Sequence, residues 1–442
     1  MITVYTIEPQ VSSNSALDRR SIHFVRLPAA SVASEPYHPR SFAASCRCRD
    51  PPCFGVRLSA EKTMKTNSCR YAIFAALAVW FTFCLANSRC WADDAHVLLF
   101  ESGKEGYPRY RIPTLVVARS GALVAVCEGR VDGGGLTGNV DLVSKRSFNN
   151  GKNWSARTLV AEAADDTLGN ASALVDRETG VIWIAGTISP GKQLESAITR
   201  GETETSTRVF VMNSRDDGKT WSTPRDITSV VKRPGWTWYG CGPGVGIQLK
   251  NGRLFFPCYH AEGEQGRTKR THAIFSDDHG KTWQLSANAG TGNGEPQALQ
   301  REDGSIYVSA RTASGGPHVR SIIESQDNGA TWSEKRFDES IYDCYCQASL
   351  LNLPSADAKP RWLYCHPAGP SRRDLTIRLS RDEGRTWDAG SLLLREGNGQ
   401  YSSMALLPNG CVGVLYDLWE NNNYQLYFTA FSLDDVAADS VK

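Results

Sequence analysis

The chain has 442 residues and a formal net charge of +2, from 49 basic and 47 acidic side chains. The charges form no long basic run, so nothing in the composition points to a nucleic-acid partner. The length alone would suggest about three domains, but an internal repeat after residue 92 favours one closed ring for most of the chain.

The first 92 residues differ from the remainder in composition. Residues 1–63 are rich in Ser, Arg, Ala and Pro without strand or helix periodicity, which predicts a non-native or disordered extension. Met64 then precedes two basic residues and the apolar run 71–86. This order predicts a signal peptide over 64–92, translation from Met64, and a secreted or periplasmic protein. The alternative is a genuine tail with one transmembrane anchor, although the run is short for that. No other membrane contact is expected.

One eight-residue phrase, Ser-x-Asp-x-Gly-x-Thr-Trp, recurs along residues 93–442. The four complete copies begin at Ser214, Ser276, Ser325 and Ser380, and a degenerate copy begins at Ser147. Spacings of 49 to 67 residues indicate one supersecondary unit per repeat. Ser, Asp and Gly are turn formers, and the Trp is suited to packing under a hairpin. The phrase lacks the ligand run of a calcium loop, so we interpret it as a structural turn.

Short apolar runs separated by turns fill the same region, and no amphipathic helix of 12 residues occurs. The clearest runs are 114–118, 122–127, 181–185, 208–212, 254–257, 305–310 and 411–416. The repeat spacing therefore predicts an all-β fold for 93–442, a six-bladed β-propeller of four-stranded blades. We expect the strand around 424–431 to close the ring with N-terminal material.

Cysteine spacing indicates no metal site, and no cofactor is expected. Cys127 and Cys411 lie in apolar runs and are predicted to be small core residues. Cys344-x-Cys346 is too closely spaced for a structural zinc knuckle. Export would permit disulfides, but seven cysteines follow residue 92 and their pairing cannot be read from spacing.

Several charged and phenolic residues stand at strand edges in different blades, where propeller loops gather at one mouth. These residues are Arg111, Glu295, Arg311, Arg372, Arg373, Tyr401 and Asp417. A single arginine of this kind is usually a solvated surface residue, whereas several at equivalent blade positions suggest a shared site.

With these motifs in this order, residues 97–432 resemble the sialidase (neuraminidase) superfamily of Asp-box, or BNR-repeat, exo-sialidases. The motifs are the repeated turn, Arg-Ile-Pro at 111–113, Gly-Pro-Gly-Val-Gly at 242–246, Gly-Glu-Pro-Gln at 294–297 and Tyr-Ser at 401–402. Each is weak alone, and their order makes the resemblance specific. It implies the same six-bladed propeller.

The resemblance also implies roles for the strand-edge residues. Arg111, Arg311 and Arg373 would clamp a sugar carboxylate, with Arg372 as the alternative third arginine, because guanidinium meets carboxylate through a planar fork. Tyr401 would be the nucleophile and Glu295 the base that activates it. Asp417 would brace the first arginine.

The chain departs from the family pattern at the acid/base aspartate. The family places it about two dozen residues after the first arginine, where this chain has Gly135 and Leu136. Asp132, a few residues earlier, is the candidate acid, while Asp141 matches a structural position. A missing acid lowers the rate roughly 10²–10⁴-fold. In addition, Val245 replaces a histidine common in the Gly-Pro-Gly segment.

The resemblance thus implies a secreted exo-α-sialidase-like glycoside hydrolase that removes terminal sialic (nonulosonic) acid with retention through a Tyr nucleophile. Its partners would be sialylated or other acidic glycans on glycoproteins, glycolipids or oligosaccharides. Two alternatives stay open because of the altered acid loop. One is a non-catalytic propeller that binds acidic glycans, and the other is a hydrolase or lyase for another acidic sugar, such as a uronate.

Overall fold

The computed structural model describes residues 90, 95–132, 138–354 and 359–436. The predicted extension 1–63 and signal peptide 64–92 lie outside the described residues, apart from Cys90. Contacts divide the chain into a unit of residues 1–77 and a unit of residues 78–442, and every described residue belongs to the second. Within the described ranges, no helix is long and apolar enough to cross a membrane.

Nearly all the regular structure in this unit is β-strand, arranged in antiparallel meanders. Three sheets have four strands each. They comprise β1 (Val97–Phe100), β27 (Asn423–Phe431), β26 (Val412–Glu420) and β25 (Ser402–Leu406); β17 (Asn293–Gln300), β18 (Ile306–Thr312), β19 (Val319–Ser325) and β20 (Arg336–Tyr342); and β21 (Ser349–Asn352), β22 (Trp362–Gly369), β23 (Arg373–Ser380) and β24 (Gly390–Asn398).

Two larger sheets complete the set. The six-stranded sheet holds β10 (Tyr239–Cys241), β12 (Ile247–Gln248), β13 (Leu254–Glu262), β14 (Thr268–Ser276), β15 (Gln284–Leu285) and β16 (Ala289–Thr291). The nine-stranded sheet holds β2 (Arg109–Val117), β3 (Leu123–Arg130), β4 (Val140–Ser147), β5 (Thr158–Ala161), β6 (Thr167–Val175), β7 (Ile182–Ser189), β8 (Arg208–Ser214), β9 (Arg225–Asp226) and β11 (Gly244–Val245). The described helices are short: α2 (Glu195–Arg200), α3 (Thr228–Val231), η1 (Glu264–Gly266) and η2 (Leu433–Asp435).

The predicted all-β propeller arrangement is confirmed, and each predicted apolar run falls on a strand. Six separate blades are not observed, because the described strands form five hydrogen-bonded sheets. The nine-stranded sheet contains two meanders, β2 to β5 and β6 to β9, which one parallel pair, Val140 and Thr167, joins.

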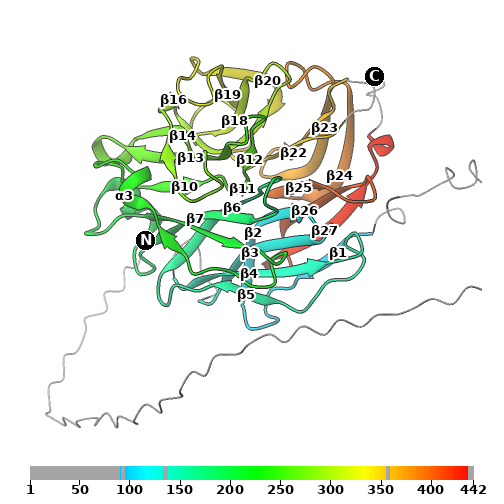
Figure 1. Cartoon of the computed structure of the whole chain (residues 1–442), viewed down its shortest axis with the longest axis horizontal. Helices are drawn as coiled ribbons and strands as arrows, with labels where there is room; N and C mark the ends of the chain where they lie inside the picture. The colour runs from blue at the N-terminus through cyan, green and yellow to red at the C-terminus, as the bar shows by residue number, and fades with distance from the viewer. Residues whose placement is uncertain (1–89, 91–94, 133–137, 355–358, 437–442) are drawn as a thin grey trace, which may run out of the picture. The chain divides into compact units, whose positions relative to one another are not determined.

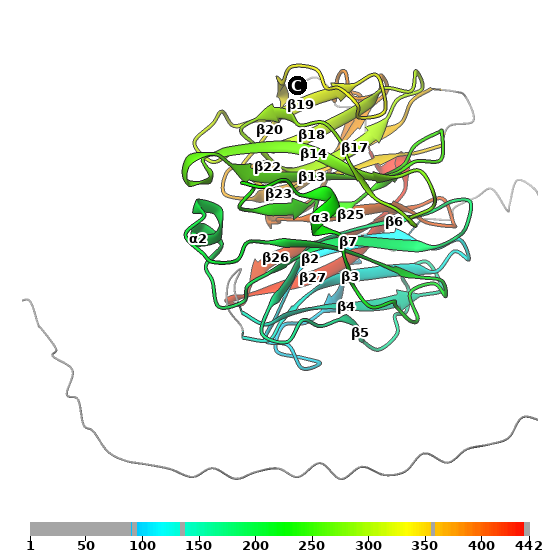
Figure 2. The ribbon, with the colours of Figure 1, turned by 60° about the vertical axis from the view of Figure 1, so that its left-hand side comes forward.

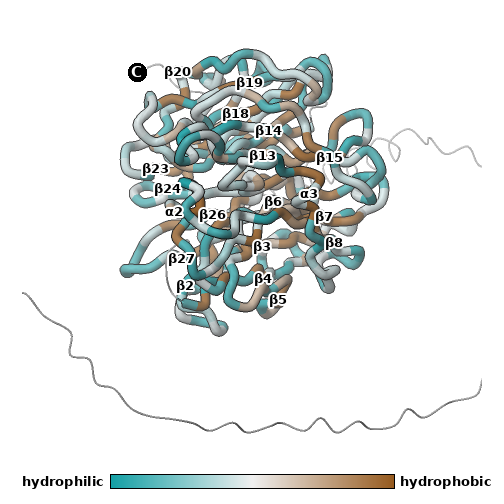
Figure 3. The backbone as a smooth tube through the Cα atoms, turned by 90° about the vertical axis from the view of Figure 1, so that its left-hand side faces the viewer, coloured by the Kyte–Doolittle hydropathy of each residue, from teal (hydrophilic) through white to brown (hydrophobic). Residues whose placement is uncertain are grey.

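The innermost strands lie against one another in a closed circuit. In order around the ring, β2 contacts β6, β6 contacts β10 and β12, β10 contacts β17, β17 contacts β21, β21 contacts β25, and β25 contacts β2. Figure 1 shows β2, β6, β12 and β25 near the centre and β5, β16 and β20 toward the rim. Hydrophobic segments lie mainly in the strands, whereas the rim loops are mostly hydrophilic (Figure 3).

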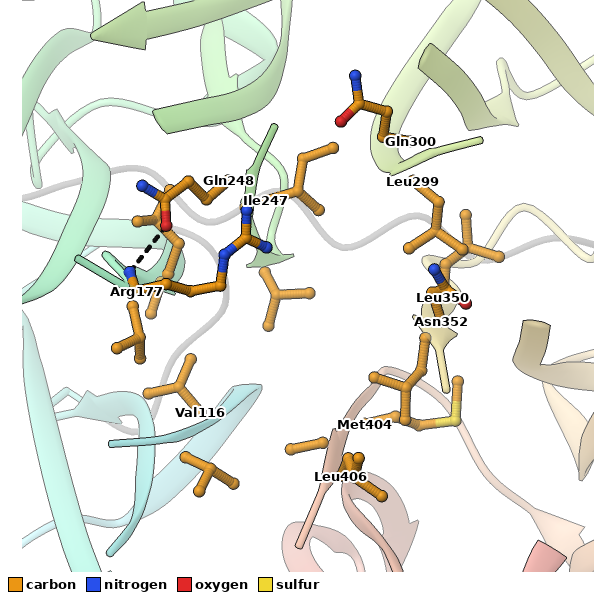
Figure 4. A pocket seen from close by; sticks show the side chains of 18 of the residues that line it. Val116, Arg177, Ile247, Gln248, Leu299, Gln300, Leu350, Asn352, Met404 and Leu406 are labelled. Carbon is orange, nitrogen blue, oxygen red and sulfur yellow. Dashed lines mark hydrogen bonds between the residues drawn. The ribbon is translucent and has the colours of Figure 1, made fainter. Parts of the chain in front are cut away.

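A pocket of about 390 Å³ lies where six inner strands approach the axis. Each of six inner strands contributes at least one apolar residue to its lining, among them Val116, Ala173, Ile247, Leu299, Leu350 and Met404. Figure 4 shows several of these side chains together with the polar Arg177, Gln248, Gln300 and Asn352, so the lining is mixed.

Each of the five copies of the repeated phrase forms a tight turn, as predicted, and the sheet that contains β1 and β27 carries no copy. In the copy that begins at Ser214, the Ser214 hydroxyl accepts the Gly218 N–H at 2.9 Å and donates to Asp216. Asp216 in turn accepts the Thr220 N–H at 2.8 Å. The other copies repeat this network, so the motif satisfies its own turn and takes no part in the central site.

The two ends of the described unit meet in one sheet. β1 pairs with β27, so N-terminal material closes the ring as predicted. A disulfide joins Cys90 to Cys411. Cys411 is therefore a buried disulfide partner as well as a core residue, whereas Cys127 is a free buried thiol.

Candidate active site

A cavity of about 380 Å³ collects most of the predicted site residues at one mouth of the ring. Its lining is strongly charged and carries more arginines than carboxylates. The charged residues that line it are Arg109, Arg111, Arg130, Arg311, Arg372, Glu128, Glu195 and Glu295. Five arginines against three glutamates give an excess of positive charge, which favours an anionic ligand.

Two β-bulges aim site residues into the cavity. The pairing of β2 with β3 shifts between Arg111 and Thr114, and Ile112 has a φ of 62°. The pairing of β17 with β18 shifts at Glu295, which has a φ of 38°. Bulges re-aim side chains, and left-handed backbone at non-glycine residues is strained, as is common at functional sites. A proline follows each bulged residue in the sequence, which explains the Ile-Pro and Glu-Pro motifs.

Tyr401, Glu295 and Arg311 form one hydrogen-bonded unit. The Tyr401 hydroxyl donates to Oε1 of Glu295. Arg311 Nη1 donates to the other oxygen of Glu295 at 2.8 Å and lies 3.4 Å from the Tyr401 hydroxyl. Tyr401 and Glu295 are both buried. The unit therefore brings a phenol, its hydrogen-bonded carboxylate and a cation together at the wall of the cavity.

The electrostatics of this unit keep the carboxylate charged and the phenol neutral. Burial opposes ionisation of Glu295, but the charge of Arg311 and the hydrogen bonds outweigh it and lower the pKa of Glu295. Burial, followed by the charge of Glu295, raises the pKa of Tyr401 well above its usual value. At neutral pH, Glu295 is thus a proton acceptor beside a protonated phenol.

Arg111 is braced from behind by Asp417. Arg111 Nε donates to Oδ2 of Asp417 at 2.9 Å, and its guanidinium lies 4.0 Å from the Tyr424 ring centroid. Asp417 is fully buried and also accepts the Tyr401 N–H at 2.8 Å. This carboxylate therefore fixes both the first arginine and the backbone of the phenol.

The structure places Arg372, and not Arg373, at the cavity. Arg372 donates to the Gln400 side chain at 3.0 Å, and its guanidinium lies 5.5 Å from the Tyr401 ring centroid. Arg373 begins β23, is exposed and does not line the cavity. Ser371 and Arg372 both have left-handed backbone, each with a φ of 58°, so the chain turns just before β23 and the two neighbouring arginines point in different directions.

Asp132 is not brought to the cavity. It is exposed, and its carboxylate accepts the Asn139 N–H at 2.8 Å, which closes the base of its own loop. Gly135 and Leu136, where an acid was expected, lie outside the described residues. Asp141 accepts a hydrogen bond from Tyr107 at 2.7 Å, which agrees with a structural role.

Sequence reasoning missed five acidic or aromatic residues that line the cavity: Glu128, Glu195, Trp238, Tyr259 and Tyr424. Glu128 lines the cavity and pairs with Arg130 at 2.7 Å, at the end of β3. Glu195 lines it from α2, which Figure 2 shows at one edge of the ring, and burial raises its pKa. Tyr424 underlies Arg111. Of these residues, only Glu128 could have been suspected from the sequence, because Glu128-Gly-Arg130 places a charged pair at the end of an apolar run.

Comparisons with known proteins agree with this fold and cavity. A family model described as a BNR repeat-like domain matches residues 121–414. A sialidase of Bacteroides fragilis (strain YCH46) is 30% identical over 355 residues, which cover 76% of this chain and 64% of the relative. A sialidase of Micromonospora viridifaciens is 29% identical over 365 residues, which cover 76% of this chain and 55% of the relative.

Among solved structures, the Hadza microbial sialidase Hz136 superposes with a TM-score of 0.69 at 30% identity, over 76% of this chain and 68% of that chain. The chain belongs to the BNR repeat-like domain family within the sialidase superfamily. It spans 64% and 55% of the length of the Bacteroides and Micromonospora relatives.

The placement of the two neighbouring arginines predicts different effects of their removal. Arg372→Ala should weaken binding of a carboxylate ligand, with free sialic acid as the probe, by roughly 10- to 100-fold, the range for a lost charge-assisted hydrogen bond. Arg373→Ala, the matched control, should change the dissociation constant by less than about twofold. Isothermal titration calorimetry measures both constants, and equal losses in the two variants would contradict the placement.

Proposed function

We propose that this protein is an exo-α-sialidase-like glycoside hydrolase that releases a terminal sialic or other nonulosonic acid with retention. The observation that supports it most is the Tyr401 hydroxyl hydrogen-bonded to Glu295 beneath the cavity arginines. Sialidases are glycosidases that use a Tyr nucleophile. The natural glycan would be a sialylated or other acidic glycoprotein, glycolipid or oligosaccharide.

In this proposal the arginines orient the substrate. Arg111, Arg311 and Arg372 line the cavity, and a sugar carboxylate would accept hydrogen bonds from all three. Asp417 holds Arg111 by one nitrogen, which leaves the rest of that guanidinium for the ligand. Binding the carboxylate places the adjacent anomeric carbon above the Tyr401 oxygen.

The phenol then attacks with help from Glu295. An anionic carboxylate nucleophile would be repelled by the substrate carboxylate, whereas a neutral phenol is not. As the Tyr401 oxygen bonds to the anomeric carbon, its proton passes to Glu295 along the existing hydrogen bond. Water then attacks the anomeric carbon and gives its proton to the carboxylate that protonated the leaving group, while the tyrosine oxygen leaves and takes its proton back from Glu295. Two displacements at one carbon retain its configuration.

Glu195 is our candidate for the acid that protonates the leaving group. Of the three cavity glutamates, Glu128 pairs with Arg130 and Glu295 pairs with Arg311. Among the described contacts, Glu195 has no such partner, and burial raises its pKa. A carboxyl group of this kind stays protonated to a higher pH and can donate. It takes the role first expected of Asp132.

We also propose that the ring has six blades. Counting the meanders β2–β5 and β6–β9 as separate units turns five sheets into six blades. Six inner strands around the axial pocket support that count.

We further propose that the chain is exported and cleaved before Cys90. The Cys90–Cys411 disulfide suits an oxidising compartment. Removal of the whole segment 64–92 would delete one of its two cysteines.

Loss of the nucleophile should abolish turnover but not binding. Tyr401→Phe should lower kcat/KM for an aryl sialoside by about 10³-fold or more, because the attacking oxygen is gone. Tyr424→Phe, which keeps the ring under Arg111, should cost less than about threefold. Absence of turnover in the wild-type protein, combined with tight sialic acid binding, would favour the non-catalytic reading instead. Turnover of a uronate but not of the sialoside would favour the other alternative.

Leaving-group dependence tests the acid. Glu195→Gln should slow hydrolysis of an alkyl sialoside by roughly 10²–10⁴-fold and of a nitrophenyl sialoside far less, because a good leaving group needs no proton. Asp132→Asn should leave both rates within about twofold of wild type. A large loss of alkyl sialoside hydrolysis in Asp132→Asn, with little loss in Glu195→Gln, would instead identify Asp132 as the acid.

Processing can be read directly from the exported chain. Its N-terminal sequence should begin after Met64 and before Cys90, and non-reducing peptide mapping should find Cys90 bonded to Cys411. An exported chain that begins at Asp93 would refute this.

A further inference from the structure

Two cysteines lie directly behind the nucleophile, and the proposed reaction does not use them. Cys346 is buried in a small cluster with Ile112 and Tyr401, and Cys344 packs against the same cluster. Both are free thiols. We call Cys344 and Cys346 the thiol pair.

The backbone brings the thiol pair together. Tyr345, between the two cysteines, has a φ of 58°. A left-handed residue turns the chain sharply, so that its neighbours on either side approach more closely than in a strand. Both side chains pack against the same cluster, and each affects the pKa of the other.

The two thiols differ in reactivity. Cys344 is half-buried and Cys346 is fully buried. The Cys346 side chain, the Arg372 backbone N–H and the Arg372 charge lower the pKa of Cys344 to about 7. The thiolate is the reactive form of cysteine, so Cys344 is suited to react first and Cys346 to resolve.

The same short loop supports one arginine of the cavity. Arg372 Nη2 donates to the Tyr345 carbonyl oxygen at 3.0 Å. On the far side of the loop, buried Arg320 donates to the Cys346 carbonyl oxygen at 2.8 Å and to Asp343 at 3.2 Å. Arg320 and Asp343 hold the Cys346 side of the loop in place. We therefore expect a change in loop shape to move the Tyr345 carbonyl and, with it, Arg372.

We propose that the thiol pair is a redox-sensitive modification site, in which a Cys344–Cys346 disulfide moves the Tyr345 carbonyl and weakens the grip of Arg372 on a ligand carboxylate. The oxidant is a small-molecule disulfide. The Cys344 thiolate attacks one sulfur of that disulfide and releases one thiolate. Cys346 loses its proton and attacks the Cys344 sulfur of the mixed disulfide, which releases the second. The protein loses two hydrogens, and the small disulfide becomes two thiols.

The test exposes the exported chain to excess oxidised glutathione and then removes the reagent. Peptide mapping should find Cys344 bonded to Cys346, with the corresponding loss of two hydrogens. For an aryl sialoside, KM should rise about tenfold while kcat changes less than about threefold, because one supporting hydrogen bond of the clamp is lost. Dithiothreitol should reverse both changes.

Two variants keep the result specific. Cys344→Ser should have near wild-type basal activity and show no rise in KM after oxidation. Cys241 and Cys258 are two further free cysteines, and they face each other across β10 and β13. Cys258→Ser removes one of them and should respond to oxidation as the wild-type protein does. A free Cys344–Cys346 pair after oxidation, an unchanged KM despite the disulfide, or an equal response of Cys344→Ser would each overturn the proposal.

The role given to Arg372 rests on the proposed function, but the peptide map does not. If no form of the protein turns over a sialoside, the calorimetric dissociation constant of sialic acid replaces KM. Failure of turnover would then refute the hydrolase, while the bonded peptide and a weaker sialic acid affinity would still support the thiol site.

Discussion

One buried carboxylate, that of Asp417, holds the two ends of the ring and the candidate site in a single arrangement. It accepts from the Arg111 side chain on β2 and from the Tyr401 backbone next to β25, and the Ile112 N–H lies 3.4 Å from it. A fully buried anion is costly unless it is paired and hydrogen-bonded. Asp417 meets that requirement only when the first and last sheets lie side by side, so its burial and the geometry of the site require each other.

The cavity depends on strain as well as on charge. Ile112 is β-branched and Glu295 is large, yet both have left-handed backbone at bulges. Such conformations cost of order 1–3 kcal/mol each and persist only where the surroundings fix them. Here, hydrogen bonds to Asp417 and Arg311 fix them. Regular strands would point these residues along the ring wall, and the bulges turn them toward the axis.

The sequence was informative where a motif carried its own geometry. Arg111, Glu295, Tyr401 and Asp417 were found because they stand at predicted strand edges and, apart from Asp417, within short motifs that resemble those of the family. The choice between Arg372 and Arg373 depends on a local left-handed backbone that their side chains do not specify. The position of Asp132 in the sequence made it a candidate acid, but in the structure its carboxylate closes its own loop. Glu195 was missed because its helix is short and its contribution comes only from tertiary placement.

The blade count shows a similar limit. Repeat spacing locates each turn, but it does not say whether neighbouring meanders stay separate. A single pair of residues, Val140 and Thr167, merges two of them into one hydrogen-bonded sheet. A repeat therefore predicts the unit and the ring more firmly than it predicts the boundaries between units.

The pairing of β1 with β27 has a consequence for the timing of synthesis. The ribosome makes Arg111 early and Tyr401, Asp417 and β27 last, so an unfinished chain lacks the phenol and the brace of its first arginine. The candidate site is therefore complete only after the last strands have been made. Until then Arg111 lacks its carboxylate partner, and the ring lacks the strand that pairs with β1.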